Sequence, residues 1–174
     1  YNTYRNSKEA LKNAKQVILK TKCDAVKLEG GKKIYEIIKT LVKNNIPVMG
    51  HLGLLPQSAK NFKFKGKKNY ERAKILKEAK LLETAGVFSM VLECIERSLA
   101  KAITKQIKIP TIGIGASNNC DGQILVFDDL IGLNPINVRF IKKYTNIRKE
   151  ISKAVSNYAR EVRSKKFPLK KHSY

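Results

Sequence analysis

Two apolar stretches of the chain each end in a glutamate, and these glutamates are its first candidates for chemistry. One lies in Asp24–Gly31, where Lys27 and Glu29 precede two glycines, and the other closes Phe88–Glu93. Alternate residues of a strand point to the same side, so Lys27 and Glu29 are expected to share one face. A cation and a carboxylate at the carboxyl end of a buried parallel strand form a familiar active-site arrangement. The sequence therefore predicts a site where these two strand ends meet.

Helices and strands are predicted to alternate along the chain. Helices are expected at about 7–20, 32–43, 70–85, 96–107 and 134–165, and strands at 23–28, 46–50, 87–92, 111–114 and 123–127. Ser7 is expected to cap the first helix and Gly86 to end the third. Short apolar strands between helices indicate a parallel sheet with both faces covered.

This alternation favours an α/β barrel. A barrel closes with eight βα units, so five strands suggest that three are missing from the N-terminal side. The alternative is an open doubly wound sheet, but the first strand lacks the glycine-rich dinucleotide turn that is typical of that fold.

We expect residues 1–174 to form a single domain, with βα units to about residue 133 and a helical tail over about 134–174. A chain of 174 residues with 43% hydrophobic content can build one core. No apolar run approaches the ~20 residues that a membrane-spanning helix needs. The first residue is Tyr1 and no signal-peptide pattern follows, so a processed chain or a fragment is expected.

The formal net charge of +22 raises the question of nucleic-acid binding. Lysine supplies 29 of the 36 basic residues, whereas readers of bases and phosphates favour the planar fork of arginine. The lysines are also spread over nearly every predicted helix. This distribution indicates a compositional bias of the whole sequence, and specific nucleic-acid binding is not expected.

The three cysteines, Cys23, Cys94 and Cys120, show neither metal-like nor disulfide-like spacing. An odd number without such spacing favours free thiols in a reducing cytoplasm. Cys23 and Cys94 flank predicted strands, so they are interpreted as small buried residues.

Seven segments, taken in order, resemble the family of the 3-methyl-2-oxobutanoate hydroxymethyltransferases, also called ketopantoate hydroxymethyltransferases. The segments are 26–31, 46–54, 56–58, 91–94, 109–116, 121–126, and Phe167-Pro168 with His172-Ser173-Tyr174 at the end. Each segment is short, and it is their order and spacing across the whole chain that make the resemblance specific.

The resemblance implies a (β/α)8 TIM barrel of the phosphoenolpyruvate-mutase type. It implies transfer of a hydroxymethyl group from 5,10-methylenetetrahydrofolate to 3-methyl-2-oxobutanoate, which gives 2-dehydropantoate on the route to pantothenate. It also implies Mg²⁺ and a large homo-oligomer, commonly a decamer. By this comparison about the first three strands, with two metal-binding aspartates and a substrate-binding serine, lie upstream of Tyr1. We expect the chain without them to be inactive or prone to aggregation.

The resemblance also implies roles for individual residues. Glu93 matches the proton acceptor, Lys27 the lysine that contacts the substrate, and Glu29 the metal-associated glutamate. His51, just past a strand end, could hydrogen-bond the substrate or a carboxylate. The alternatives are a structural pair of Lys27 and Glu29, a structural histidine, and a Glu93 that only caps the next helix. Glu96 is the better candidate for that cap.

Two further positions stay open. Residues 61–68 interleave aromatic residues with lysines, which alone would suggest single-stranded nucleic acid; the resemblance favours a lid or a contact to polyglutamyl folate. Asp128 stands where relatives commonly have histidine.

Two other functions remain as alternatives: a basic protein that binds RNA or an acidic partner, and a lyase of the same barrel superfamily that acts on another 2-oxo acid.

Overall fold

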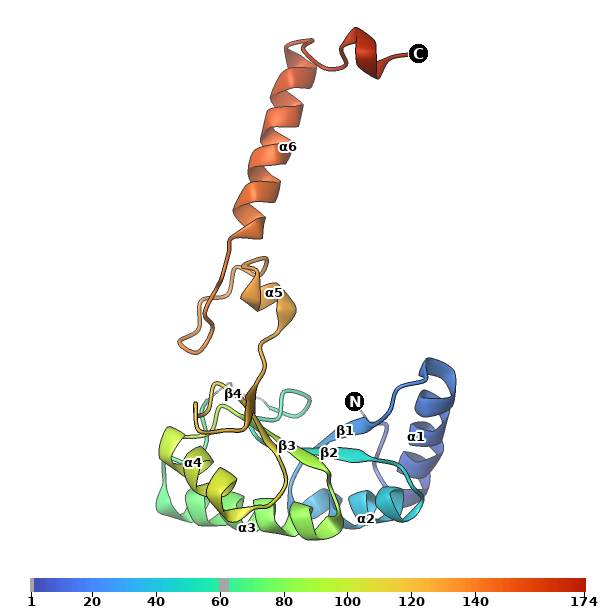
Figure 1. The fold of residues 1–174 in the computed structure, drawn as a ribbon, viewed down its shortest axis with the longest axis vertical. Coiled ribbons are helices and arrows are strands. Elements are labelled where there is room, and N and C mark those ends of the chain that lie inside the picture. The colour runs from blue at the N-terminus through green and yellow to red at the C-terminus, as the bar shows by residue number, and fades with distance from the viewer. Residues whose placement is uncertain (1, 60–62) are drawn as a thin grey trace. The chain divides into compact units, whose positions relative to one another are not determined.

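Five parallel strands form one sheet in the order in which they occur along the chain (Figure 1). They are β1 (Val26–Glu29), β2 (Val48–Gly53), β3 (Ser89–Glu93), β4 (Thr111–Ile114) and β5 (Gly122–Gln123). This computed structural model describes residues 2–59 and 63–174. Sequential order is the order of adjacent strands in a barrel wall, whereas the order reverses in a doubly wound sheet. The predicted parallel α/β class is confirmed, and the strand order agrees with part of a barrel.

The helices that follow the first three strands pack against one face of the sheet. They are α2 (Tyr35–Lys43), preceded by a 3₁₀ turn at Lys32–Ile34, α3 (Asn69–Ala85) and α4 (Arg97–Gln106). A further helix, α1 (Ser7–Thr21), precedes β1 and packs against α2. Figure 1 shows α2, α3 and α4 on the same side of the strands. Leu28, Leu52 and Leu92 point to this side and belong to the core, each at most 4% exposed. Among the described residues up to 124, helices therefore cover one sheet face, not the two that were predicted.

Local signals predicted some element ends and missed others. Gly86 ends α3 in the left-handed conformation, with φ 94°, as predicted. The cap of α1 is Asn6, not Ser7, because the Asn6 side chain accepts the N–H of Glu9 at 2.9 Å. Of the strand predicted at 123–127, only Gln123 is in a strand, because β5 covers Gly122–Gln123 and the short helix α5 already begins at Phe127.

The chain divides into two compact units, Tyr1–Ile124 and Leu125–Tyr174. The second unit contains α5 (Phe127–Leu130), α6 (Ile147–Arg163) and a 3₁₀ turn at Lys170–His172. The helix predicted from 134 begins only at Ile147, capped by the Asn146 side chain. The residues before it fold back on α5, because the Tyr144 N–H donates to the Leu130 carbonyl at 2.8 Å.

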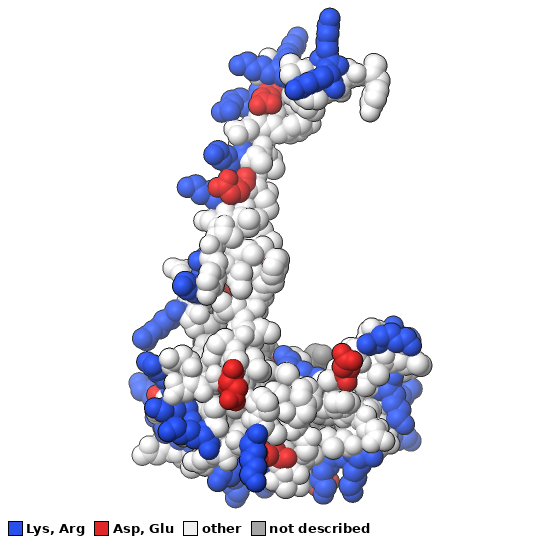
Figure 2. Space-filling model, in the orientation of Figure 1, with Lys and Arg blue, Asp and Glu red and all other residues white. Residues whose placement is uncertain are grey.

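Basic residues are spread over the visible face of both units, with acidic residues among them (Figure 2). This distribution agrees with a bias of the whole sequence and does not single out one basic patch on this face. Within the described ranges, no helix combines the length and the apolar character needed to cross a membrane.

Candidate active site

The carboxyl ends of β1, β2 and β3 bring Glu29, His51 and Glu93 together. Glu29 is in register with His51, and Gly53 is in register with Glu93. Because paired residues of parallel strands point to the same side, and alternate residues keep that side, all three side chains lie on the face opposite the helices. His51 Nε2 is 3.2 Å from Glu93 Oε2, and His51 Nδ1 is 3.9 Å from Glu29 Oε1. The imidazole therefore lies between the two predicted carboxylates.

His51 is the most buried member of this group, with 1% of its surface exposed. Neither ring nitrogen makes a hydrogen bond to another described residue, because the short contact with Glu93 is not aligned for one. Buried polar atoms in proteins nearly always have a partner. An imidazole with two unsatisfied nitrogens beside two carboxylates can accept or donate a proton, which is a property of a reactive site.

Glu29 is held by its neighbours. The Gln57 backbone N–H donates to Glu29 Oε2 at 3.1 Å, and the Glu29 backbone N–H donates to the Tyr4 hydroxyl at 3.4 Å. The Tyr4 hydroxyl in turn donates to Gln57 Oε1 at 3.4 Å. Burial raises the pKa of Tyr4, the hydrogen bond from the Glu29 backbone N–H lowers it, and the negative charge of Glu29 raises it. Tyr4 therefore remains a neutral phenol.

A glycine turn brings Gln57 to this position. Gly53 ends β2 with φ 101°, and a Cβ there would collide with the Glu93 carbonyl oxygen. The Leu54 N–H donates to that same carbonyl at 2.8 Å. Only glycine allows this close approach of the two backbones, and the loop that carries Gln57 begins here.

Glu93 is held less firmly than Glu29, and the next helix does not use it as a cap. The Glu96 side chain caps α4 by accepting the N–H groups of Ser98 and Leu99, each at 3.0 Å. Hydrogen bonds from Ser98, and further ones from Arg72 and Leu99, lower the pKa of Glu96 to about 2. The prediction that Glu96 is the cap is confirmed, and the carboxylate of Glu93 remains available to the site.

Comparisons with known proteins identify the family of the chain. A family model described as ketopantoate hydroxymethyltransferase matches residues 1–170. The chain belongs to this family. It is 69% identical over 174 residues to the 3-methyl-2-oxobutanoate hydroxymethyltransferase of Pelagibacter ubique, and the match covers 100% of this chain and 68% of the relative.

More distant relatives carry the same name. The enzyme of Clostridium botulinum (strain Alaska E43 / Type E3) is 46% identical over 170 residues, which cover 95% of this chain and 62% of the relative. The enzyme of Rhizobium etli is 45% identical over 179 residues, which cover 100% of this chain and 66% of the relative. The chain thus spans about two thirds of the length of these hydroxymethyltransferases.

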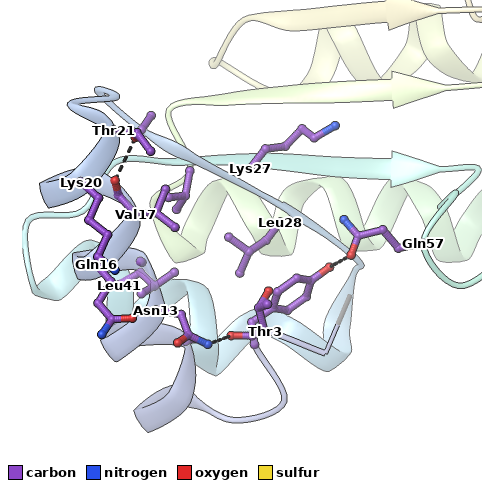
Figure 3. A pocket seen from close by; sticks show the side chains of 15 residues that line it. Thr3, Asn13, Gln16, Val17, Lys20, Thr21, Lys27, Leu28, Leu41 and Gln57 are labelled. Carbon is purple, nitrogen blue, oxygen red and sulfur yellow. Dashed lines mark hydrogen bonds between the residues drawn. The ribbon is translucent and has the colours of Figure 1, made fainter.

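Lys27 lies on the same sheet face as Glu29, His51 and Glu93 but is not part of their close contacts. Figure 3 shows Lys27 and Leu28 pointing to opposite sides of β1. Lys27 is exposed, and the salt bridges of the described residues do not include it. The structure therefore gives no support to a structural pair of Lys27 and Glu29.

The described residues do not form a complete metal site. No group of three or more His, Cys, Asp or Glu within them is arranged to hold a metal ion. Mg²⁺ requires near-octahedral oxygen ligands, and Glu29 offers one carboxylate whose Oε2 already accepts the Gln57 N–H. These residues alone do not fit Mg²⁺.

The segment predicted as a lid is only partly described. Asn61 and Phe62 lie outside the described residues. After them, the Lys65 N–H donates to the Cys94 carbonyl at 2.7 Å, and the Glu96 N–H donates to the Lys65 carbonyl at 2.8 Å. This part of the segment is therefore fixed beside the end of β3, and a role as a lid or folate contact stays a prediction.

The remaining candidates are Asp128 and the three cysteines. Asp128 is exposed in the first turn of α5, in the second unit. Cys94 and Cys120 are buried free thiols, as is typical of small core residues, and Cys23 is half-buried. Burial, and then the charge of Glu93, raises the pKa of Cys94. Cys94 therefore stays a thiol and is not suited to be a nucleophile.

Proposed function

We propose that the protein transfers a hydroxymethyl group from 5,10-methylenetetrahydrofolate to 3-methyl-2-oxobutanoate and so forms 2-dehydropantoate for pantothenate biosynthesis. The observation that carries the proposal is the cluster of Glu29, His51 and Glu93 on the sheet face opposite the helices, in a chain whose relatives are named for this substrate. A separate residue caps α4, which leaves Glu93 for chemistry.

In this proposal Glu93 is the base. It removes the proton from C3 of the oxo acid, and the electrons of that C–H bond form the enolate. C3 of the enolate then forms the new carbon–carbon bond to the methylene carbon of the folate donor, as the bond of that carbon to N10 breaks and N10 takes up the proton removed from C3. Water then replaces N5 at the same carbon to give the hydroxymethyl group, its second proton goes to N5, and tetrahydrofolate leaves. The Glu93 side chain is 14% exposed, so its carboxylate stays accessible for this proton transfer.

Lys27 and His51 act on the charge of the oxo acid. Lys27 projects from the same sheet face, and its ammonium group can pair with the carboxylate or enolate oxygen. The unsatisfied nitrogens of His51 can donate to a substrate oxygen. Both roles are substrate-binding roles, whereas Glu93 takes part in proton transfer.

The cofactor and compartment follow from the same resemblance. We propose Mg²⁺ as the metal, with Glu29 as one carboxylate ligand and the other ligands outside the described cluster. The free cysteines agree with a reducing compartment such as the cytoplasm.

We also propose a homo-oligomer, for which the resemblance suggests a decamer. Four side chains at helical spacing form an exposed apolar stripe along α6: Ile151, Val155, Tyr158 and Val162. Such a stripe usually packs against another surface. Replacing both Ile151 and Val155 by Asp is expected to lower the mass measured by light scattering. The control double variant, Lys149→Asp with Lys153→Asp on the same helix, should leave the mass unchanged. If both double variants keep the mass of the unsubstituted protein, the stripe does not take part in assembly.

The direct test is product formation by the purified protein that contains this chain. Formation of 2-dehydropantoate that depends on both the oxo acid and the folate donor would support the proposal. Conversion of a 2-oxo acid without the folate donor would contradict it and favour the lyase alternative. Sequence-selective RNA binding at physiological salt, without product, would favour the basic binding protein.

A further inference from the structure

The backbone immediately after Glu93 has a conformation that is uncommon for its residue type. Cys94 has φ 49°, in the left-handed region, which residues with a Cβ rarely adopt. Such a residue keeps this conformation only where the surrounding structure holds it there. Cys94 directly follows Glu93, the base of the proposed reaction, so a relaxation of its φ would move the backbone that carries the base.

Hydrogen bonds hold both peptide units that flank Cys94. In the unit before it, the Glu93 carbonyl accepts the Leu54 N–H at 2.8 Å. The N–H of the same unit donates to the Ile114 carbonyl, also at 2.8 Å. In the unit after it, the Cys94 carbonyl accepts the Lys65 N–H at 2.7 Å. The relative orientation of these two units sets φ and ψ of Cys94, so its left-handed conformation depends on Lys65 as well as on the sheet.

Glu71 fixes the peptide unit that joins Lys65 to Gly66. The Gly66 N–H donates to Glu71 Oε2 at 2.7 Å. The carbonyl of the same unit, that of Lys65, accepts the Glu96 N–H at 2.8 Å. Hydrogen bonds to a carboxylate are stronger than those to a neutral acceptor. Arg72, the next residue of α3, donates to the Gly66 carbonyl at 3.4 Å and pairs with the Glu96 carboxylate. The start of α3 therefore holds Lys65 against the connection between β3 and α4.

We propose that Glu71 is a positioning residue for the base Glu93, because it holds the segment that keeps Cys94 in its left-handed conformation. The inference rests on the proposed function, in which Glu93 removes the proton from C3 of the oxo acid. The Glu93 carboxylate itself stays adjustable, because these contacts fix only the backbone beside it. Displacement of a reacting group by about 1 Å can cost on the order of 100-fold in rate. Loss of the Glu71 carboxylate is expected to lower kcat about 10-fold, since the sheet and Arg72 still restrain the segment.

Glu71→Ala tests the contacts themselves through amide hydrogen exchange in the protein that contains this chain. The Lys65 and Glu96 amides are expected to exchange about 10-fold faster, while the Met90 amide within β3 keeps its protection. Glu36→Ala is the matched control, because it also removes an acidic side chain from the first turn of a helix. It should leave these amides unchanged. Unchanged exchange at Lys65 and Glu96 in Glu71→Ala, or an equal change at Met90, would overturn the proposal.

Steady-state kinetics separate a positioning role from substrate binding. Glu71→Ala should lower kcat about 10-fold and change KM for the oxo acid less than about 2-fold, and the rate of proton exchange at C3 should fall by the same factor as kcat. Glu71→Gln keeps an oxygen that can accept the Gly66 N–H, so its kcat should stay within about 3-fold of the unsubstituted protein. A loss confined to KM, or an equal loss of kcat in both variants, would overturn the positioning role.

A double-mutant cycle with Cys94→Gly tests whether Glu71 acts through the left-handed residue. Glycine adopts φ 49° without strain, so in this background the conformation depends less on the contacts around Lys65. Glu71→Ala should then lower kcat less than about 3-fold, against about 10-fold with Cys94 present. The same loss in both backgrounds would overturn the proposal. Absence of product from the unsubstituted protein would contradict the proposed function instead, and amide exchange would then decide whether Glu71 holds the segment.

Discussion

Glu29 and Glu93 close two strands of the same sheet, but their surroundings differ. The Glu29 side chain is 7% exposed and accepts a hydrogen bond from the Gln57 backbone. The Glu93 side chain is 14% exposed, and its close polar contact among the described residues is His51 at 3.2 Å. A carboxylate held at one oxygen suits a fixed role in binding. A carboxylate with one adjustable contact suits proton transfer, because a base must change partners during the reaction.

His51 connects the two carboxylates and lies nearer to Glu93 than to Glu29, by the distances of 3.2 and 3.9 Å. The difference predicts that substitutions at Glu93 act on the proton-transfer step. Substitutions around Glu29 should instead act on the geometry of the bound substrate.

The largest effect is expected from Glu93→Gln. The amide has nearly the same shape but cannot accept a proton, so the rate of product formation should fall about 100- to 10,000-fold. The assay is 2-dehydropantoate formation at saturating substrates. Glu36→Gln, an exposed glutamate on α2, is the control and should retain the full rate. A rate near that of the control would show that Glu93 is not the base.

His51→Asn is expected to lower kcat by about 100-fold, because the shorter side chain leaves both carboxylates without their shared neighbour. Its coupling with Glu93→Gln, measured in a double-mutant cycle, should exceed its coupling with Glu29→Gln, in keeping with the two distances. Equal couplings would remove the distinction between the carboxylates.

Lys27→Ala should raise KM for the oxo acid about 10- to 100-fold, as expected for loss of a charge-assisted hydrogen bond, with a smaller change in kcat. Steady-state kinetics with the oxo acid varied measures this division. Lys33→Ala, also exposed, is the control. An unchanged KM would leave Lys27 without a substrate contact.

The smallest effect concerns Glu96, whose capping role leaves Glu93 available. Glu96→Gln should lower the free energy of unfolding by about 1 kcal/mol at pH 7. The Glu96 pKa is about 2 in the folded chain, below the ordinary 4.5. Its charge therefore stabilises the fold fully above pH 4.5, and this contribution is lost as the pH falls toward 2. Denaturant unfolding at pH 7 and pH 3 should show the difference shrinking; a constant difference would contradict the ionic cap.

The sequence predicted the two strand-end glutamates because parallel strands place their carboxyl ends at one edge, and a short apolar run marks each strand. It also distinguished Glu96 from Glu93, since a cap is a local feature. Tyr4 was missed because its contacts lie 25 and 53 residues away, and no periodicity reports such pairs. Gln57 lay in a recognised segment, but its hydrogen bond to Glu29 depends on the turn at Gly53.

The errors have the same origin. The helix predicted from 134 begins only at Ile147, because long-range backbone contacts with α5 hold residues before it in an irregular path. The near-complete burial of His51 was likewise not evident from its place at a strand end. Local pattern predicted which residues are candidates for chemistry, whereas tertiary contacts determine how each one is held.

The most direct test of the account is isotope exchange at C3 of 3-methyl-2-oxobutanoate, followed in deuterated water without the folate donor. Exchange reports proton removal alone, separate from carbon–carbon bond formation. The account predicts that the unsubstituted protein and Glu36→Gln exchange this proton, and that Glu93→Gln does not. Full exchange in Glu93→Gln would contradict the assignment of Glu93 as the base.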